Sequence, residues 1–185
     1  MKTIYIVRHA KSSWEIRDLP DEKRPLLEKG ITRTKKIARE LKRQEVVIDH
    51  ILCSSAVRSL ETAKLLAEGL KIPGQSIEII PEIYEADSGR VIEILSALPD
   101  NIQSLALVGH NPSVTDLVNL FISLPLESLP TSGVVSISFN ISKWIDLTSH
   151  LTMSILSSSP TSCPDKVDMS LRKDYFCNTI LAIHL

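Results

Sequence analysis

The stretch IYIVRHAKSSW, residues 4–14, decides the fold of this chain and raises the question of its function. Four strand-forming residues, 4–7, lead into an Arg–His pair, and a short polar loop follows. Consecutive residues on a strand point to opposite faces of the sheet. If Arg8 and His9 act together, the strand must end at Val7 or Arg8, so that the backbone turns and both side chains reach one pocket.

Further apolar runs of strand length alternate with segments in which apolar residues recur every three or four positions. The predicted strands are 3–7, 48–53, 77–80, 105–109 and 134–139. The predicted helices are 27–42, 57–70, 90–98 and 114–121. This alternation predicts an α/β three-layer sandwich, in which helices flank a largely parallel central sheet. In such a fold, ligands bind beyond the carboxyl ends of the strands.

The length of 185 residues predicts one domain with a full-sized core. The net charge is only −1, but residues 1–72 carry 16 basic and 10 acidic residues, whereas the remainder carries 5 and 12. A basic first part suits an anionic ligand, yet the basic residues between 29 and 43 fit the solvated face of a helix better. Because no recognition motif or aromatic platform accompanies them, we expect no nucleic-acid partner.

Three cysteines without the spacing of a metal site argue against a disulfide framework and favour a reducing compartment. The first apolar run is too short for a signal peptide, and no stretch approaches the length of a membrane span. We therefore expect a cytoplasmic protein without membrane contact. Residues 142–185 are rich in serine and threonine, and we expect them to form a loosely ordered segment after a domain that spans residues 1–141.

Two further strand ends carry residues suited to an anion. In SSAVRSLETA, residues 54–63, Ser55 is the predicted helix cap and Arg58 the third helical residue. In VGHNP, residues 108–112, His110 follows the strand, with the next two residues as predicted cap and first helical position. Two arginines and two histidines at three strand ends predict a cationic pocket with a nucleophilic nitrogen, which suits phosphoryl transfer.

The motifs RHAKSSW (8–14), RPLLEKG (24–30), CSSAVRSLETA (53–63) and VGHNP (108–112) occur in an order that resembles the histidine phosphatase superfamily, and within it the small SixA-type phosphohistidine phosphatases. The resemblance spans roughly residues 1–140 and implies the phosphoglycerate mutase-like form of the sandwich. It implies that His9 attacks phosphorus, while Arg8, Arg58 and His110 hold the phosphoryl oxygens. It implies no metal or other cofactor, because the arginines supply the charge that Mg²⁺ supplies elsewhere.

The resemblance places the proton donor after the third strand, where PEIYEAD, residues 81–87, offers Glu82 as the preferred acid and Glu85 as the reserve. Arg24 is implied as a further substrate contact, although it reads equally well as a loop arginine. Lys11 and Ser12 lie on the loop after His9 and are expected to reach the same pocket.

One expectation concerns the reaction and another the two tryptophans. The loop departs from the RHGES of many relatives, and the chain lacks room for the insertions with which mutases enclose a sugar phosphate, so hydrolysis is favoured. Trp14 and Trp144 are expected to pack, with the mouth of the pocket as a second place for Trp14.

We therefore expect a monomeric, metal-independent phosphatase that acts on phosphohistidine in proteins. One alternative keeps the mechanism and changes the substrate to a small phosphoester, such as a sugar phosphate or nucleotide. Another is a non-catalytic module that binds phosphoproteins, but such a module has little reason to keep His9 beside Arg8.

Overall fold

The structure is a computed structural model that describes residues 1–14, 18–122, 124–148 and 180–183. Its strands are β1 (Lys2–Arg8), β2 (His50–Cys53), β3 (Ile77–Ile79), β4 (Ser104–Gly109), β5 (Val134–Phe139) and β6 (Ile180–Ile183). Its α-helices are α1 (Glu28–Arg43), α2 (Val57–Leu70), α3 (Ser88–Ser96) and α4 (Ser113–Asn119). Short 3₁₀ turns are η1 (Asp21–Lys23), η2 (Gly74–Ser76) and η3 (Pro81–Tyr84). All nine predicted elements are present, and their ends differ by two residues or fewer from the prediction.

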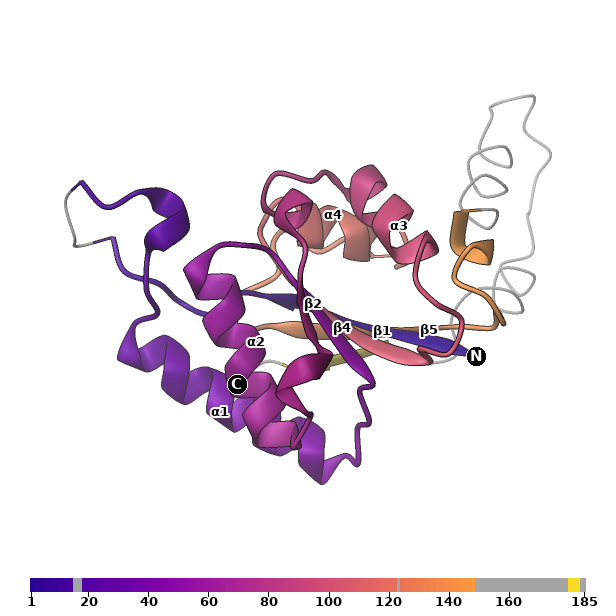
Figure 1. Ribbon diagram of the computed structural model, residues 1–185, viewed down its shortest axis with the longest axis horizontal. Helices are drawn as coiled ribbons and strands as arrows, with labels where there is room; N and C mark the ends of the chain where they lie inside the picture. Colours follow the sequence, from indigo (N-terminus) through magenta and orange to yellow (C-terminus); the bar gives the residue numbers. More distant parts are fainter. Residues whose placement is uncertain (15–17, 123, 149–179, 184–185) are drawn as a thin grey trace.

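The strands form one sheet in the order β3-β2-β4-β1-β5-β6. The first four are parallel, whereas β5 runs antiparallel to β1 and β6 antiparallel to β5. Helices α1 and α2 cover one face and α3 and α4 the other (Figure 1). The expected three-layer sandwich with a largely parallel sheet is therefore confirmed, while β6 was not predicted.

Side chains along β1 alternate between two apolar cores, one on each face of the sheet. Ile4 and Ile6 of β1 belong to the apolar cluster that includes residues of α3 and α4. Tyr5 and Val7 belong to the cluster that includes residues of α1 and α2. Because both faces of the sheet are covered, the strand sequences read as nearly continuous apolar runs.

Helix α1 accounts for much of the basic charge in the first part of the chain. Its buried residues lie on one face, at Gly30, Thr34, Ile37, Ala38 and Leu41. The lysines and arginines at 35, 36, 39, 42 and 43 are exposed. The interpretation of this basic run as the solvated face of a helix is therefore confirmed.

The packed core extends past residue 141, where the domain was expected to end. Trp144 and Leu147 are fully buried in the cluster beside α3 and α4. The indole N–H of Trp144 donates to the carbonyl oxygen of Ile102 (2.8 Å), and the Lys2 ammonium lies 5.5 Å from the indole centroid. Residues 142–148 thus belong to the domain, because a tryptophan in this segment fills its core. Most of the predicted loosely ordered segment, 149–179 and 184–185, lies outside the described residues.

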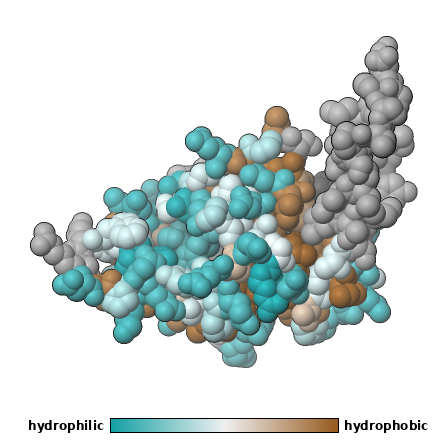
Figure 2. Space-filling view, turned by 90° about the horizontal axis from the view of Figure 1, so that it is seen from above, coloured by the Kyte–Doolittle hydropathy of each residue, from teal (hydrophilic) through white to brown (hydrophobic). Residues whose placement is uncertain are grey.

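The outer surface is mostly polar. Seen from the side of α3 and α4, hydrophilic side chains dominate and apolar ones gather in one part of the face (Figure 2). Within the described part of the chain, no helix has the length and apolarity that crossing a membrane requires.

Candidate active site

The carboxyl ends of the parallel strands bring the predicted site together. Strand β1 ends at Arg8, as expected, and Arg8 lies opposite Gly109 in the parallel register with β4. The His9 amide donates to the Gly109 carbonyl oxygen (3.0 Å), so the two chain segments leave the sheet side by side. The ring centroids of His9 and His110 are consequently 4.8 Å apart.

These side chains line a cavity of about 220 Å³. It is lined by Arg8, His9, Lys11, Ser12, Trp14, Asp21, Arg24, Arg58, His110, Asn111 and Thr131. Of the catalytic and substrate-binding residues preferred from the sequence, all line this cavity except Glu82. Four of the lining residues are lysine or arginine and one is an aspartate, so the cavity suits an anion.

The hydrogen bonds of His9 determine which of its ring nitrogens is free. Nδ1 lies 2.8 Å from the carbonyl oxygen of Ala10, which can only accept, so Nδ1 carries the proton. In the neutral ring, Nε2 therefore keeps its lone pair. The Ala10 amide donates to Oγ1 of Thr62 (2.9 Å), which ties this turn to α2. Together these bonds orient the His9 ring and leave Nε2 as the nitrogen that is available to a substrate.

Both histidines are held neutral. Burial lowers the pKa of His9 to about 4, the hydrogen bond to Ala10 opposes this, and the charge of Arg58 adds to it. Burial also lowers the pKa of His110 to about 3, with contributions from His9 and Arg58. His110 is 9 % exposed, and its Nε2 lies 2.6 Å from Oγ of the fully buried Ser54.

These pKa values predict that stability depends on histidine protonation. An unfolded histidine titrates near 6.5, so the unfolded chain binds more protons than the folded chain between pH 6.5 and about 4. The contribution of the neutral histidines to the free energy of unfolding is therefore complete above pH 6.5, and it is lost as the pH falls toward 4. In an NMR titration, the His9 and His110 ring resonances should stay unshifted from pH 8 to pH 5. A His9 midpoint near 6.5 would contradict the assignment, and the His9→Asn protein should lose less stability on acidification than the wild type.

Arg8 and Arg58 bring two guanidinium groups to the cavity. Arg8 Nη1 donates to the Leu129 carbonyl oxygen (2.8 Å). Arg58 Nη1 and Nη2 donate to the carbonyl oxygen and carboxylate of Asp21 (2.6 and 2.7 Å). The Nε atoms of both arginines are buried and find no acceptor among the described residues. Because both guanidinium groups line the cavity and carry a fixed positive charge, the pair favours an anionic ligand with acceptor oxygens.

Asp21 is a site residue that the sequence did not predict. Its carboxylate accepts from Arg24 Nη1 (2.6 Å) and from the Tyr84 hydroxyl (2.7 Å), in addition to Arg58. Burial opposes ionisation, but the hydrogen bonds outweigh it and hold the pKa of Asp21 well below its usual range. The only sequence signal was its position three residues before Arg24.

Arg24, predicted as a substrate contact, joins the loops around the cavity. Its Nε donates to the Ser13 carbonyl oxygen (2.6 Å) and its Nη2 to Oγ of Ser12 (2.9 Å). With Nη1 on Asp21, all three nitrogens are engaged. Ser12 is itself only 3 % exposed. Both residues line the cavity, but in the structure the nitrogens of Arg24 are engaged by protein groups, one of which is Ser12.

The RPLLEKG segment holds the loop that follows His9. The Leu27 amide donates to the Lys11 carbonyl oxygen (2.9 Å), and the Ser13 amide to that of Pro25 (2.9 Å). Gly30 lies directly against the Lys11 backbone: a Cβ at Gly30 would be 2.9 Å from the Lys11 amide nitrogen and closer still to its carbonyl oxygen. The glycine of this motif is therefore required for close approach of α1 to the catalytic loop.

Gly30→Ala is expected to displace that loop. Although alanine favours a helix, the contact is with backbone, and overpacking of this kind costs about 1–3 kcal/mol. A shift of the loop should also lower kcat/KM about 10²-fold. Gly74→Ala is the matched control, since nothing lies within 4 Å of a Cβ there. Urea unfolding and kinetics of both variants test this, and equal behaviour would refute it.

Two predicted helix caps are wrong. Helix α2 begins at Val57 after Ala56, which makes Arg58 the second helical residue, and Ser55 donates its hydroxyl to Glu22. Helix α4 begins at Ser113, one residue after Pro112. Asn111 accepts from Oγ1 of Thr115 (2.8 Å) through its side chain. In both cases a tertiary or side-chain partner competes successfully with the helix terminus.

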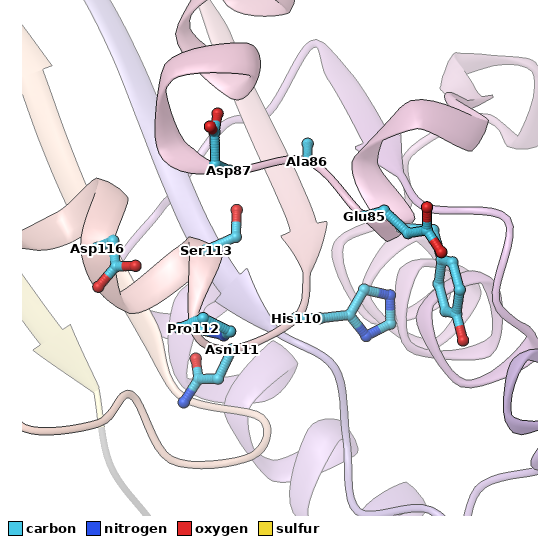
Figure 3. A pocket seen from close by; sticks show the side chains of 9 residues that line it. Glu85, Ala86, Asp87, His110, Asn111, Pro112, Ser113 and Asp116 are labelled. Carbon is cyan, nitrogen blue, oxygen red and sulfur yellow. The ribbon is translucent and has the colours of Figure 1, made fainter.

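The preferred acid, Glu82, does not reach the cavity. Its side chain is 56 % exposed and lies 3.7 Å from Arg90 Nη2. Glu85 lines a second cavity of about 240 Å³, which shares His110 and Asn111 with the first. Figure 3 shows Glu85 on the same side of that cavity as the His110 ring. Of the two candidates, it is the reserve one, Glu85, that shares a cavity with His110.

Among the described residues, no three histidine, cysteine, aspartate or glutamate side chains are grouped in a way that could hold a metal ion.

Comparisons with known proteins agree with this geometry. The model of the histidine phosphatase superfamily (branch 1) matches residues 4–103. Phosphohistidine phosphatase SixA of Escherichia coli is 30 % identical over 142 residues, which cover 74 % of this chain and 85 % of that protein. An uncharacterised protein of Mycobacterium tuberculosis is 31 % identical over 138 residues, 69 % of this chain and 84 % of its own. The solved structure of protein histidine phosphatase SixA with tungstate has a TM-score of 0.67 at 28 % identity, covering 74 % of this chain and 88 % of that one.

Proposed function

The chain belongs to the histidine phosphatase superfamily and is a hydrolase of phosphoryl bonds, and from this premise we propose that its substrate is phosphohistidine in a protein. The proposed reaction proceeds through a covalent phosphohistidine on His9 and needs no metal ion. The monomer is the proposed working unit. The cytoplasm remains the expected compartment.

The observation that carries the proposal is the state of His9. Its Nδ1–H is held by the Ala10 carbonyl oxygen, its pKa is about 4, and Nε2 therefore has a lone pair at neutral pH. Beside it, the guanidinium groups of Arg8 and Arg58, which line the same cavity, suit the oxygens of a phosphoryl group. A nucleophile next to fixed positive charge is most of what phosphoryl transfer requires.

The steps balance without an added reactant other than water. Nε2 of His9 forms a bond to phosphorus while the bond from phosphorus to the substrate imidazole breaks, and that imidazole takes up a proton from solvent water. A water molecule then attacks the phosphoryl group on His9 and returns a proton to solvent, which releases inorganic phosphate and restores the neutral ring. Imidazole is a better leaving group than an alkoxide, so phosphohistidine tolerates the exposed position of Glu82 better than a phosphoester does.

The relatives support this choice of substrate. The Escherichia coli relative is a phosphohistidine phosphatase, and the SixA structure with tungstate shows that a member of this group binds a tetrahedral oxyanion. Glu85 is the proposed proton donor wherever one is needed, because it lines the cavity that adjoins His110.

A substrate panel tests the proposal. Purified protein is incubated with a histidine-phosphorylated protein, a sugar phosphate and a nucleotide, each with and without EDTA. Release of phosphate should be fastest from the phosphorylated protein and unaffected by EDTA. Faster turnover of the sugar phosphate or nucleotide would reverse the choice of substrate, and loss of all turnover in EDTA would refute the metal-independent mechanism.

A further inference from the structure

Trp14 lies at the rim of the catalytic cavity and is 75 % exposed. Tryptophan is usually largely buried, and the other tryptophan of this chain, Trp144, is fully so, with its N–H bonded to a carbonyl oxygen. The expectation that both tryptophans pack is thus confirmed for Trp144 alone. Apart from the two histidines, Trp14 is the only aromatic side chain among the described residues that line this cavity.

The indole is held by an arginine that cannot readily move. The guanidinium carbon of Arg24 lies 3.2 Å from the centroid of the Trp14 ring. Arg24 is 7 % exposed, and its three nitrogens are engaged by Ser12, Ser13 and Asp21. Stacking on a guanidinium fixed in this way orients the ring. One face of the indole is therefore covered, and the exposed area leaves the opposite face open.

We propose that Trp14 is a specificity-determining residue, whose open face stacks on the planar leaving group of the substrate. This inference rests on the proposed phosphohistidine phosphatase function. The phosphoryl group would lie among Arg8, His9 and Arg58, which line the same cavity, and the departing imidazole would extend toward the rim. A planar ring gains from contact with an indole, whereas the alcohol of a sugar phosphate has no face to stack.

Two substrates isolate this contact. Phosphohistidine and phosphoramidate both transfer a phosphoryl group from nitrogen, but only phosphohistidine carries a ring. The measured quantity is kcat/KM for phosphohistidine divided by kcat/KM for phosphoramidate. General damage to the site lowers both values and cancels in this ratio. Aromatic contacts of this kind predict that Trp14→Ala lowers the ratio about 3- to 10-fold. Trp14→Phe, which keeps a ring, should restore most of the wild-type ratio.

Leu124→Ala is the matched control, because Leu124 is an apolar residue with 85 % exposure that does not line the cavity. Its ratio should equal that of the wild type. An unchanged ratio in Trp14→Ala would overturn the inference while leaving the proposed phosphatase intact. A wild-type protein that hydrolyses neither substrate would overturn the proposed function and the inference with it, and this result is distinct from the first.

Discussion

Replacement of His9 by asparagine is expected to lower kcat about 10⁴-fold or more, because the nucleophile is lost and no other group forms the covalent intermediate. Asparagine is close to histidine in size, and its amide nitrogen can still donate to the Ala10 carbonyl oxygen that now accepts from Nδ1. The fold should therefore persist. Steady-state kinetics and thermal unfolding of the variant measure the two effects separately.

His50→Asn is the control for this variant. His50 begins β2, at the other end of the strand from the cavity, and its Nε2 lies 2.9 Å from a carboxylate oxygen of Glu78. Its replacement should leave kcat within about twofold of the wild type, because His50 does not line the cavity. If His9→Asn kept more than a small fraction of wild-type activity, the assignment of the nucleophile would be wrong.

Arg58→Ala is expected to lower kcat/KM about 10²- to 10⁴-fold, because a fixed positive charge beside the phosphoryl group is removed. Arg58 is 6 % exposed and donates twice to Asp21, so its loss also leaves that carboxylate with fewer partners. Arg58→Lys should recover little, since a lysine cannot make the same pair of hydrogen bonds. Inhibition by tungstate, measured on the residual activity, reports the binding of an oxyanion, and it should weaken in both variants.

Arg43→Ala provides the comparison for Arg58. Arg43 pairs with Glu40 on the surface of α1, and its side chain is 73 % exposed. Its removal should change neither turnover nor inhibition. Equal inhibition by tungstate in the wild type and in Arg58→Ala would exclude Arg58 from the anion site.

The sequence could predict that four side chains lie close together, because this follows from the order of strands and helices. They are Arg8, His9, Arg58 and His110. Each residue follows an apolar run, and parallel strands place their carboxyl ends at one edge of the sheet. The end of β1 at Arg8 was predictable for the same reason, since two neighbours on a strand cannot otherwise reach one pocket.

The supporting contacts were not predictable because they join segments far apart in sequence. Asp21 reaches Arg58 across 37 positions and Tyr84 across 63. Gly30 owes its role to the distance between α1 and the backbone of Lys11, which no local pattern encodes. Glu82 was preferred by resemblance to the family's pattern, but the direction of each side chain depends on the 3₁₀ turn η3 and its C-cap Glu85, and periodicity gives no guide to that.

The position of the phosphoryl group on the trapped intermediate tests the central claim most directly. Protein quenched during turnover of phosphohistidine would be digested and its acid-labile phosphate located by mass spectrometry and ³¹P NMR, which distinguishes the two ring isomers. Because the Ala10 carbonyl oxygen holds the proton on Nδ1, the phosphate should be on Nε2 of His9. Phosphate on Nδ1 or on another residue, or turnover with no phosphoenzyme, would contradict the account.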